Sequence, residues 1–106
     1  MIDHLKQVKP IELFQKLQQG ENCELIDVRE PHEHEQFNIG GRLIPLDDIM
    51  GKSGSIPRDK EVILYCKMGI RSQIAIQRLQ ERFGFTNLVN LQGGMEAWKK
   101  EFKTST

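Results

Sequence analysis

Three stretches of the sequence carry apolar residues at the spacing of an amphipathic helix. The first spans residues 9–17, with Pro10 suited to the first helical position. The longest spans residues 71–83 and is followed by Gly84, which favours a helix end. The last spans residues 95–102 and follows a pair of glycines. We therefore expect three amphipathic helices, separated by segments of different character.

Short apolar runs between these stretches predict strands. The runs are residues 24–28, 42–44, 61–65 and 88–91. A charged turn or short helix is expected at 31–37, and one helical turn at 46–50. Because strands alternate with helices, we predict an α/β fold with a mostly parallel sheet and helices on both faces. We take residues 1–106 as a single domain, since this length is near the common domain size.

Composition restricts the classes of partner. The chain has 15 basic and 15 acidic residues, so no net charge attracts it broadly to nucleic acid or to an anionic membrane. No apolar run reaches membrane-spanning length, and the first residues lack the layout of a signal peptide. We expect a cytoplasmic location and two free thiols, Cys23 and Cys66, because two cysteines make no disulfide framework.

Cys66 directly follows the clearest strand, where open α/β sheets form their ligand sites. The longest helix has begun six residues later, and its N-terminus supplies unsatisfied N–H groups and partial positive charge. Gly69 lets the loop curl, and Ser72 can cap the helix or donate to an anion. Lys67 and Arg71 add positive charge beside the thiol. This setting predicts a thiolate near neutral pH that attacks sulfur or another soft electrophile.

No general base is required, because such a nucleophile is already an anion. The three histidines all precede Cys66 in the sequence. The competing interpretation is that a lone cysteine at the end of an apolar strand is a small buried hydrophobic residue. The Gly69, Arg71 and Ser72 context argues against it.

Three segments resemble motifs of the rhodanese homology family. They are L-I-D-V-R-E-P at 25–31, C-K-M-G-I-R-S at 66–72 and G-G-M-E-A-W at 93–98. The resemblance covers about residues 5–102 and implies a rhodanese-like domain with a central, mostly parallel five-stranded sheet. It also implies a persulfide on Cys66, held by the amides of the loop. The loop residues are Lys67, Met68, Gly69, Ile70, Arg71 and Ser72.

The sequence after Arg29, E-P-H-E-H-E, is similar to rhodanese domains found with ubiquitin-like activating enzymes of molybdopterin and thiamine synthesis. This similarity implies a sulfur-relay protein as a possible partner, beside a small donor such as thiosulfate or a persulfide. Neither a metal nor a cofactor is expected. The chain departs from the family where Asn38 replaces a histidine, which bears on the shape of that loop.

Asp27 and Arg29 flank the end of an early strand and are candidates for supporting the active loop or meeting an anionic donor. We favour a buried ion pair that anchors the chain turn, because charges seldom stay buried unpaired.

The charged segment after Pro31 contains His32 and His34, interleaved with acidic residues. Positions i and i+2 of a helix point apart, which is poor geometry for metal ligands, so we interpret this segment as a solvated face. Cys23 could resolve a Cys66 persulfide as a disulfide, but we take it as structural or incidental.

The favoured function is a sulfurtransferase. One alternative is a phosphatase or arsenate reductase of the same architecture, whose signature places five residues between cysteine and arginine. Four residues separate Cys66 from Arg71, which suits a sulfur atom better than a tetrahedral oxyanion. Another alternative is a non-catalytic binding module. The physiological donor and acceptor and the oligomeric state are open at this point.

Overall fold

The computed structural model describes residues 5–103, so part of the segment considered for a signal peptide lies outside it. The five strands are β1 (Lys6–Val8), β2 (Cys23–Asp27), β3 (Arg42–Leu43), β4 (Glu61–Tyr65) and β5 (Leu88–Leu91). The helices are α1 (Pro10–Gln18), α2 (Pro31–Gln36), α3 (Ile70–Phe83) and α4 (Gly94–Phe102), with short 3-10 turns at Leu46–Asp48 and Ser53–Ser55.

The strands form one sheet in the order β1-β5-β4-β2-β3, and every pairing is parallel. This confirms the predicted α/β class and sharpens "mostly parallel" to entirely parallel. The hydrophobic pattern alone missed β1, which has three residues of which only Val8 is buried. The edge position of β1 against β5 explains why so little apolar signal is needed there.

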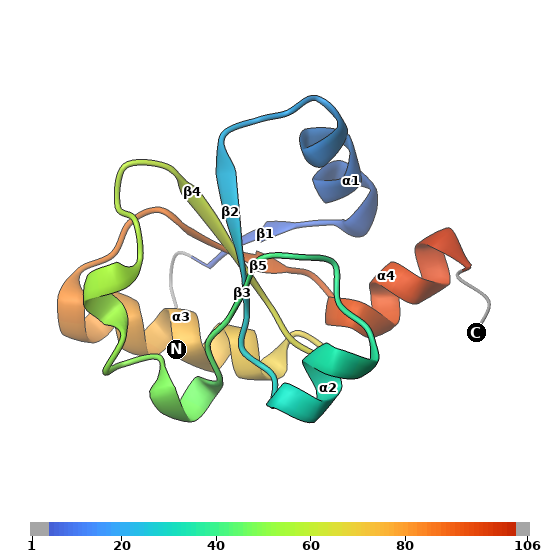
Figure 1. The fold of residues 1–106 in the computed structure, drawn as a ribbon. Helices are drawn as coiled ribbons and strands as arrows, with labels where there is room; N and C mark the ends of the chain where they lie inside the picture. Colours follow the sequence, from blue (N-terminus) through green and yellow to red (C-terminus); the bar gives the residue numbers. More distant parts are fainter. Residues whose placement is uncertain (1–4, 104–106) are drawn as a thin grey trace.

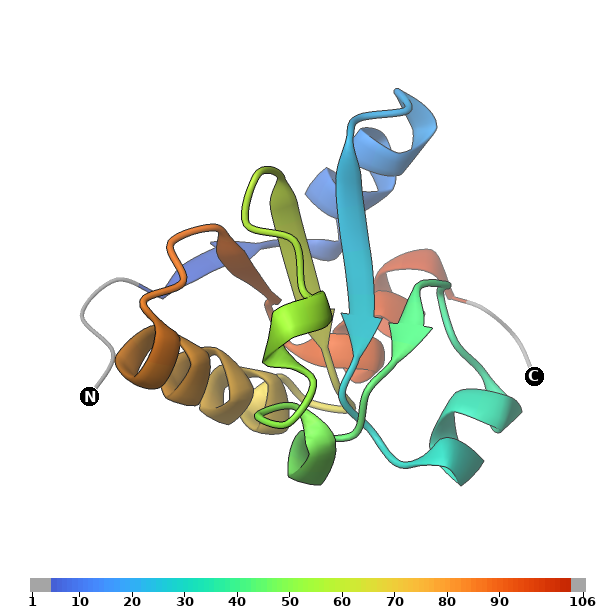
Figure 2. The ribbon, with the colours of Figure 1, turned by 60° about the vertical axis from the view of Figure 1, so that its left-hand side comes forward.

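Helices cover both faces of the sheet, as predicted. Helix α3 packs on one face, and α1 and α4 pack together on the other (Figure 1 and Figure 2). Side chains of β4 alternate between these layers: Val62 and Leu64 join the core beneath α3, whereas Ile63 and Tyr65 join the core beneath α1 and α4. Cys66 continues this alternation and faces the α3 side.

Local signals set the helix boundaries close to those expected. Helix α1 starts at Pro10, where the Glu12 carboxylate accepts the N–H of Lys9 at 2.8 Å. Helix α3 starts at Ile70, one residue before the predicted start, and ends at Phe83, with Gly84 as its C-cap residue. None of the helices within residues 5–103 is long and apolar enough to cross a membrane. The short helix α2 and the first turns of α3 and α4 gather where the strands end (Figure 1).

Candidate active site

Cys66 is the first residue after β4, and its side chain is only 1% exposed. Two backbone N–H groups donate to its Sγ atom: Gly69 N lies at 3.1 Å and Ser72 N at 3.4 Å. Both belong to the start of α3, where N–H groups have no partner within the helix. The structure therefore surrounds the sulfur with the kind of backbone donors that the strand–loop–helix pattern predicted.

Ser72 does not cap α3, which corrects one of the two roles expected for it. The cap residue is Gly69, whose φ of 89° lies in the left-handed region. Ser72 lies in the first turn of the helix, fully buried, with its hydroxyl oxygen 3.4 Å from the sulfur. The hydroxyl donates to Asn90 Oδ1 on β5, and Asn90 Nδ2 donates to Gln7 Oε1 on β1 at 3.0 Å. Sequence reasoning missed Asn90 and Gln7 because they lie far from the loop along the chain.

The start of α4 holds the other side of the loop. The N–H of Met95 donates to the carbonyl of Cys66 at 2.8 Å, and that of Glu96 donates to the carbonyl of Lys67 at 2.9 Å. A Cβ atom on Gly94 would lie 2.5 Å from the Cys66 carbonyl oxygen and 2.6 Å from that of Lys67. The glycine pair in the third motif thus allows a close approach of α4 to the backbone of Cys66.

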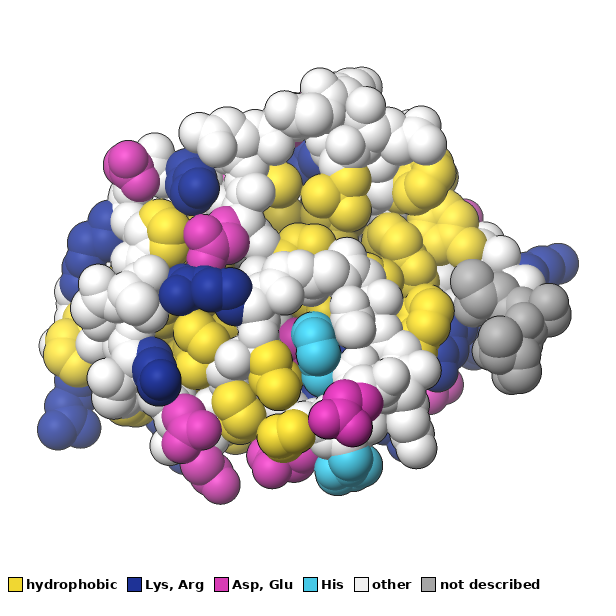
Figure 3. Space-filling model, viewed as in Figure 1, with side chains coloured by type: hydrophobic (Ala, Val, Ile, Leu, Met, Phe, Trp, Pro, Cys, Tyr) yellow, Lys and Arg dark blue, Asp and Glu magenta, His cyan; other side chains and the backbone are white. Residues whose placement is uncertain are grey.

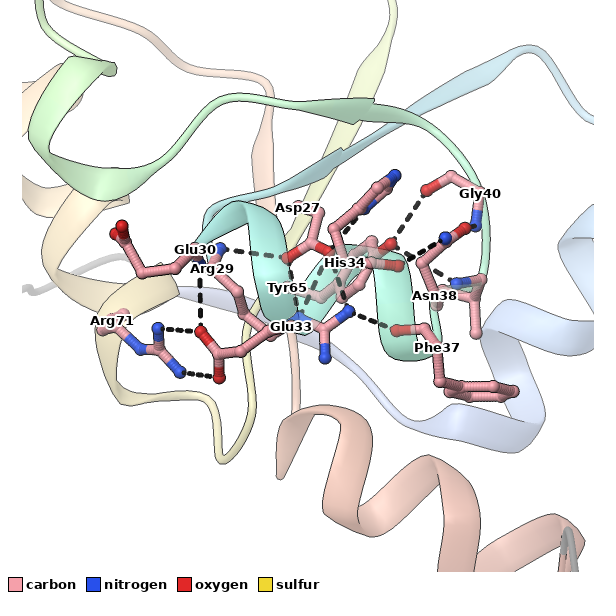
Figure 4. A network of polar contacts seen from close by, with 11 residues as sticks. Asp27, Arg29, Glu30, Glu33, His34, Phe37, Asn38, Gly40, Tyr65 and Arg71 are labelled. Carbon is pink, nitrogen blue, oxygen red and sulfur yellow. Dashed lines mark hydrogen bonds and ion pairs between the residues drawn. The ribbon is translucent and has the colours of Figure 1, made fainter. Parts of the chain in front are cut away.

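Arg71 is held by Glu33 of α2 rather than left free beside the thiol. Its two terminal nitrogens donate to the two carboxylate oxygens at 2.8 and 2.9 Å (Figure 4). The hydrogen bonds from Arg71 lower the pKa of Glu33 to about 2. The same contact raises the pKa of Arg71. The expectation that Glu33 belongs to a solvated face is wrong: this residue ties α2 to the active loop.

Asp27 and Arg29 form the expected ion pair, and both are buried. Arg29 Nη2 donates to Asp27 Oδ2 at 2.8 Å and to the carbonyl of Phe37 at 2.7 Å (Figure 4). Burial opposes the charged form of Arg29, but the hydrogen bond and charge of Asp27 outweigh it and raise its pKa. His34 Nδ1 lies 2.9 Å from Asp27 Oδ2, so His34 also does not belong to the solvated face.

His32 and Glu35 are exposed, as predicted for that segment. Histidine and acidic side chains gather over α2 in the space-filling view (Figure 3). Within residues 5–103, no group of three or more His, Cys, Asp and Glu side chains is arranged to hold a metal ion.

The loop in which Asn38 replaces the family histidine is closed by hydrogen bonds. Asn38 Oδ1 accepts the N–H of Gly40 at 2.9 Å, and its Nδ2 donates to the His34 carbonyl at 2.8 Å. The buried Tyr65 hydroxyl donates to the Gly40 carbonyl at 2.9 Å (Figure 4). Burial raises the pKa of Tyr65, so the phenol stays a donor. Asn38 therefore supplies a compact turn in place of the histidine.

The outer side of the loop faces solvent. Met68 and Ile70 are 60% and 63% exposed, and Lys67 is exposed as well. A cleft of about 360 Å³ borders the loop at Lys67, and Arg29 and Lys99 contribute positive charge to its lining. Glu33 and Glu96 also line it, so its charge is mixed.

Cys23 lies at the start of β2, at the opposite end of the sheet from Cys66. It pairs in register with Glu61 of β4. Burial, followed by the charge of Glu61, raises the pKa of the Cys23 thiol. The charges of Lys16 and Lys60 oppose this rise but do not outweigh it, so the thiol form is favoured, in agreement with the structural or incidental role expected from the sequence.

Known proteins match a segment of the chain that includes all three motifs. The sequence model of the family described as Rhodanese-like domain matches residues 10–101. The chain belongs to this family. Thiosulfate sulfurtransferase GlpE from Coxiella burnetii is 32% identical to this rhodanese-like domain, over 94% of the chain and 92% of the relative.

A second relative is much longer than this chain. The probable adenylyltransferase/sulfurtransferase MoeZ from Mycobacterium tuberculosis is 39% identical over 91% of the chain, which spans about a quarter (25%) of that relative's length. Among solved structures, a rhodanese-related protein from Thermoplasma volcanium superposes with a TM-score of 0.79. It is 27% identical, and the match covers 91% of this chain and 92% of that one. The rhodanese-like fold and homology to sulfurtransferases are thereby established.

Proposed function

We propose that this rhodanese-like domain is a sulfurtransferase that carries sulfane sulfur as a persulfide on Cys66. The observation that carries the proposal is the pair of N–H groups, from Gly69 and Ser72, that donate to Cys66 Sγ at the N-terminus of α3. Oriented backbone dipoles of this kind stabilise an anion without a neighbouring general base.

In the first step, the Cys66 thiolate attacks the outer sulfur of a donor. With thiosulfate, a new S–S bond forms, the original S–S bond breaks, and its electron pair leaves with sulfite. The N–H groups of Ile70 and Arg71, at the first two positions of α3, are available to the outer sulfur of the resulting persulfide anion. Glu33 holds the Arg71 side chain beside this loop. The positive charge of Arg71 also favours an anionic product.

In the second step, a thiophilic acceptor attacks the outer sulfur. The bond between the two sulfurs breaks, and its electron pair returns to Cys66 as a thiolate. With cyanide as acceptor, the product is thiocyanate, and the cycle consumes no proton, metal or electron carrier.

The pairing of Arg71 with Glu33 favours sulfur over phosphate as the group that the loop holds. Phosphate is often bound by an arginine that directs two parallel N–H donors and its positive charge at the oxyanion. Both terminal nitrogens of Arg71 are instead engaged by the Glu33 carboxylate. The pair neutralises the charge of Arg71 and uses one donor of each terminal nitrogen, so Arg71 offers less to a tetrahedral oxyanion than an unpaired arginine would.

The proposal also covers the sulfur donor, a protein partner and the cellular compartment. The donor is thiosulfate or a persulfide, consistent with the name of the Coxiella burnetii relative, and a sulfur-relay protein is the proposed larger partner. The exposed Met68 and Ile70 leave the loop accessible to such a partner. A reducing, cytoplasmic location suits a domain whose two cysteines are free thiols.

Turnover assays separate the candidate functions. We expect thiocyanate formation from thiosulfate and cyanide, loss of that activity in Cys66→Ser, and no hydrolysis of a small aryl phosphate. Robust phosphate hydrolysis that depends on Cys66 would overturn the proposal. Absence of both activities, with any binding function unchanged in Cys66→Ala, would favour a non-catalytic module.

A further inference from the structure

A chain of polar groups runs from the sulfur through the interior of the sheet to its surface. Cys66 Sγ contacts Ser72 Oγ at 3.4 Å, the Ser72 hydroxyl donates to Asn90 Oδ1, and Asn90 Nδ2 donates to Gln7 Oε1 at 3.0 Å. Cys66, Ser72 and Asn90 are buried, whereas Gln7 is exposed.

The direction of this chain has a chemical consequence. An amide oxygen only accepts hydrogen bonds, so the Ser72 hydroxyl must donate when Asn90 Oδ1 faces it. The hydroxyl then presents only a lone pair to Cys66. A thiol can donate to that lone pair, whereas a thiolate or persulfide anion is repelled by it.

The chain can also run the other way. If the amides of Gln7 and Asn90 both turn over, Asn90 Nδ2 donates to Ser72 Oγ, and the hydroxyl must donate to the sulfur. No covalent bond changes in this reversal. Ionisation of Cys66 is a separate step, in which the S–H bond breaks, the electron pair stays on sulfur as the thiolate, and water accepts the proton. The Ser72 hydroxyl then donates its hydrogen bond to the thiolate. A side-chain amide carries a donor and an acceptor of similar shape, which makes both directions possible.

We propose that Asn90 is a positioning residue that sets which way the Ser72 hydroxyl points and so controls ionisation of Cys66. Gln7 is the surface end of the chain, where water can satisfy its amide in either orientation. The consequence for sulfur transfer rests on the proposed function, but control of thiol ionisation does not.

Other charged groups near the sulfur come from different elements and stay unchanged in the test. They are Arg71 with its partner Glu33, the exposed Lys67, the Asp27–Arg29 pair at the end of β2, and Glu96 at the start of α4.

The test measures the pH midpoint of Cys66 ionisation from thiolate ultraviolet absorbance, in a Cys23→Ser background so that one thiol titrates. Gln7→Glu replaces an amide by an acceptor of the same shape at an exposed position. It fixes Asn90 Nδ2 towards position 7, and therefore keeps the Ser72 hydroxyl donating away from the sulfur. We expect the midpoint to rise by about one pH unit, the scale of a hydrogen bond to a charged group.

Asn90→Leu is the opposite perturbation. It removes the competing acceptor and leaves the sulfur as the partner of the Ser72 hydroxyl, so the midpoint should fall by a similar amount. Both shifts should shrink to a small residual in a Ser72→Ala background, because the hydroxyl transmits them. A direct charge effect of Gln7→Glu would persist in that background.

Equal shifts with and without the Ser72 hydroxyl, or no shift with Gln7→Glu, would overturn the inference. Gln7→Glu keeps the test decisive if Asn90→Leu fails to fold. Because the measurement requires no donor or acceptor, loss of the sulfurtransferase proposal would leave this result readable.

Discussion

Cys23 begins β2 and Cys66 directly follows the neighbouring parallel strand β4, so the two thiols lie at opposite ends of the sheet. At the carboxyl end, Cys66 receives two N–H groups from the first turn of α3. At the amino end, Cys23 lies beside Glu61, and burial raises its pKa. Because a parallel sheet directs the N-termini of its following helices to one end, only the carboxyl end supplies helix N–H donors to a cysteine sulfur. The two residues are both cysteines, so their positions in the fold distinguish the proposed nucleophile, Cys66, from Cys23.

The largest expected effect is on the free energy of unfolding, and it compares a glycine at the carboxyl end of the sheet with one at the amino end. Gly94→Ala places a Cβ 2.5 Å from the Cys66 carbonyl oxygen, whereas Gly84→Ala, also at positive φ, meets nothing within 4 Å. We expect unfolding free energy to fall by about 3–5 kcal/mol for Gly94→Ala and about 1–2 kcal/mol for Gly84→Ala. Urea denaturation measures both, and equal losses would show that α4 does not press on the loop as described.

Removal of the arginine at the loop should slow sulfur loading more than it destabilises the fold. Arg71→Ala removes a cation beside the Cys66 loop, where we propose that the persulfide forms, and leaves the Glu33 carboxylate unpaired near it. We expect loading about tenfold slower, followed by quenched intact-mass spectrometry, and partial recovery when Glu33→Gln is added. Arg82→Ala, in the exposed last turn of α3, is the matched control. Parallel loss of thermal stability and loading rate would count against this role.

The same ion pair predicts an acid-sensitive contribution to stability. The pKa of Glu33 is lowered from 4.5 to about 2, so its contribution is complete above pH 4.5 and is lost as the pH falls towards 2. Relative to Glu33→Gln, the native chain should lose about 1–2 kcal/mol of unfolding free energy across this range, after allowance for partial exposure. A constant difference between the two proteins down to pH 2 would contradict the pairing.

The smallest expected effect is at the amino end of the sheet. Cys23→Ser should leave the rate of sulfur loading unchanged within about twofold, because burial raises the pKa of the Cys23 thiol and Cys23 lies at the opposite end of the sheet from Cys66. A larger loss would mean that Cys23 resolves or relays the persulfide.

The fold and the backbone geometry around Cys66 could be predicted because their signals are local. The apolar run 61–65, Cys66 and the helix beyond it lie in one short segment that dictates strand, loop and helix. The hydrophobic pattern did not predict strand β1, because Lys6–Val8 buries a single side chain.

The contacts of Glu33 and Asn90 could not be predicted, because their partners are distant in the sequence. Glu33 meets Arg71 38 residues later, and Asn90 meets Gln7 across 83 residues. A short charged helix looks solvated when the fold that places it beside the loop is unknown. The E-P-H-E-H-E segment was the available signal for Glu33, and nothing in the local sequence marks Asn90.

The contrast between the two thiols is tested most directly by locating the sulfur. The native chain is incubated with thiosulfate, trapped with an alkylating reagent, digested and examined by mass spectrometry. We predict one added sulfur on the peptide that contains Cys66, none on the peptide that contains Cys23, and removal of the adduct by cyanide. An adduct on Cys23, or an adduct that survives in Cys66→Ser, would contradict the account.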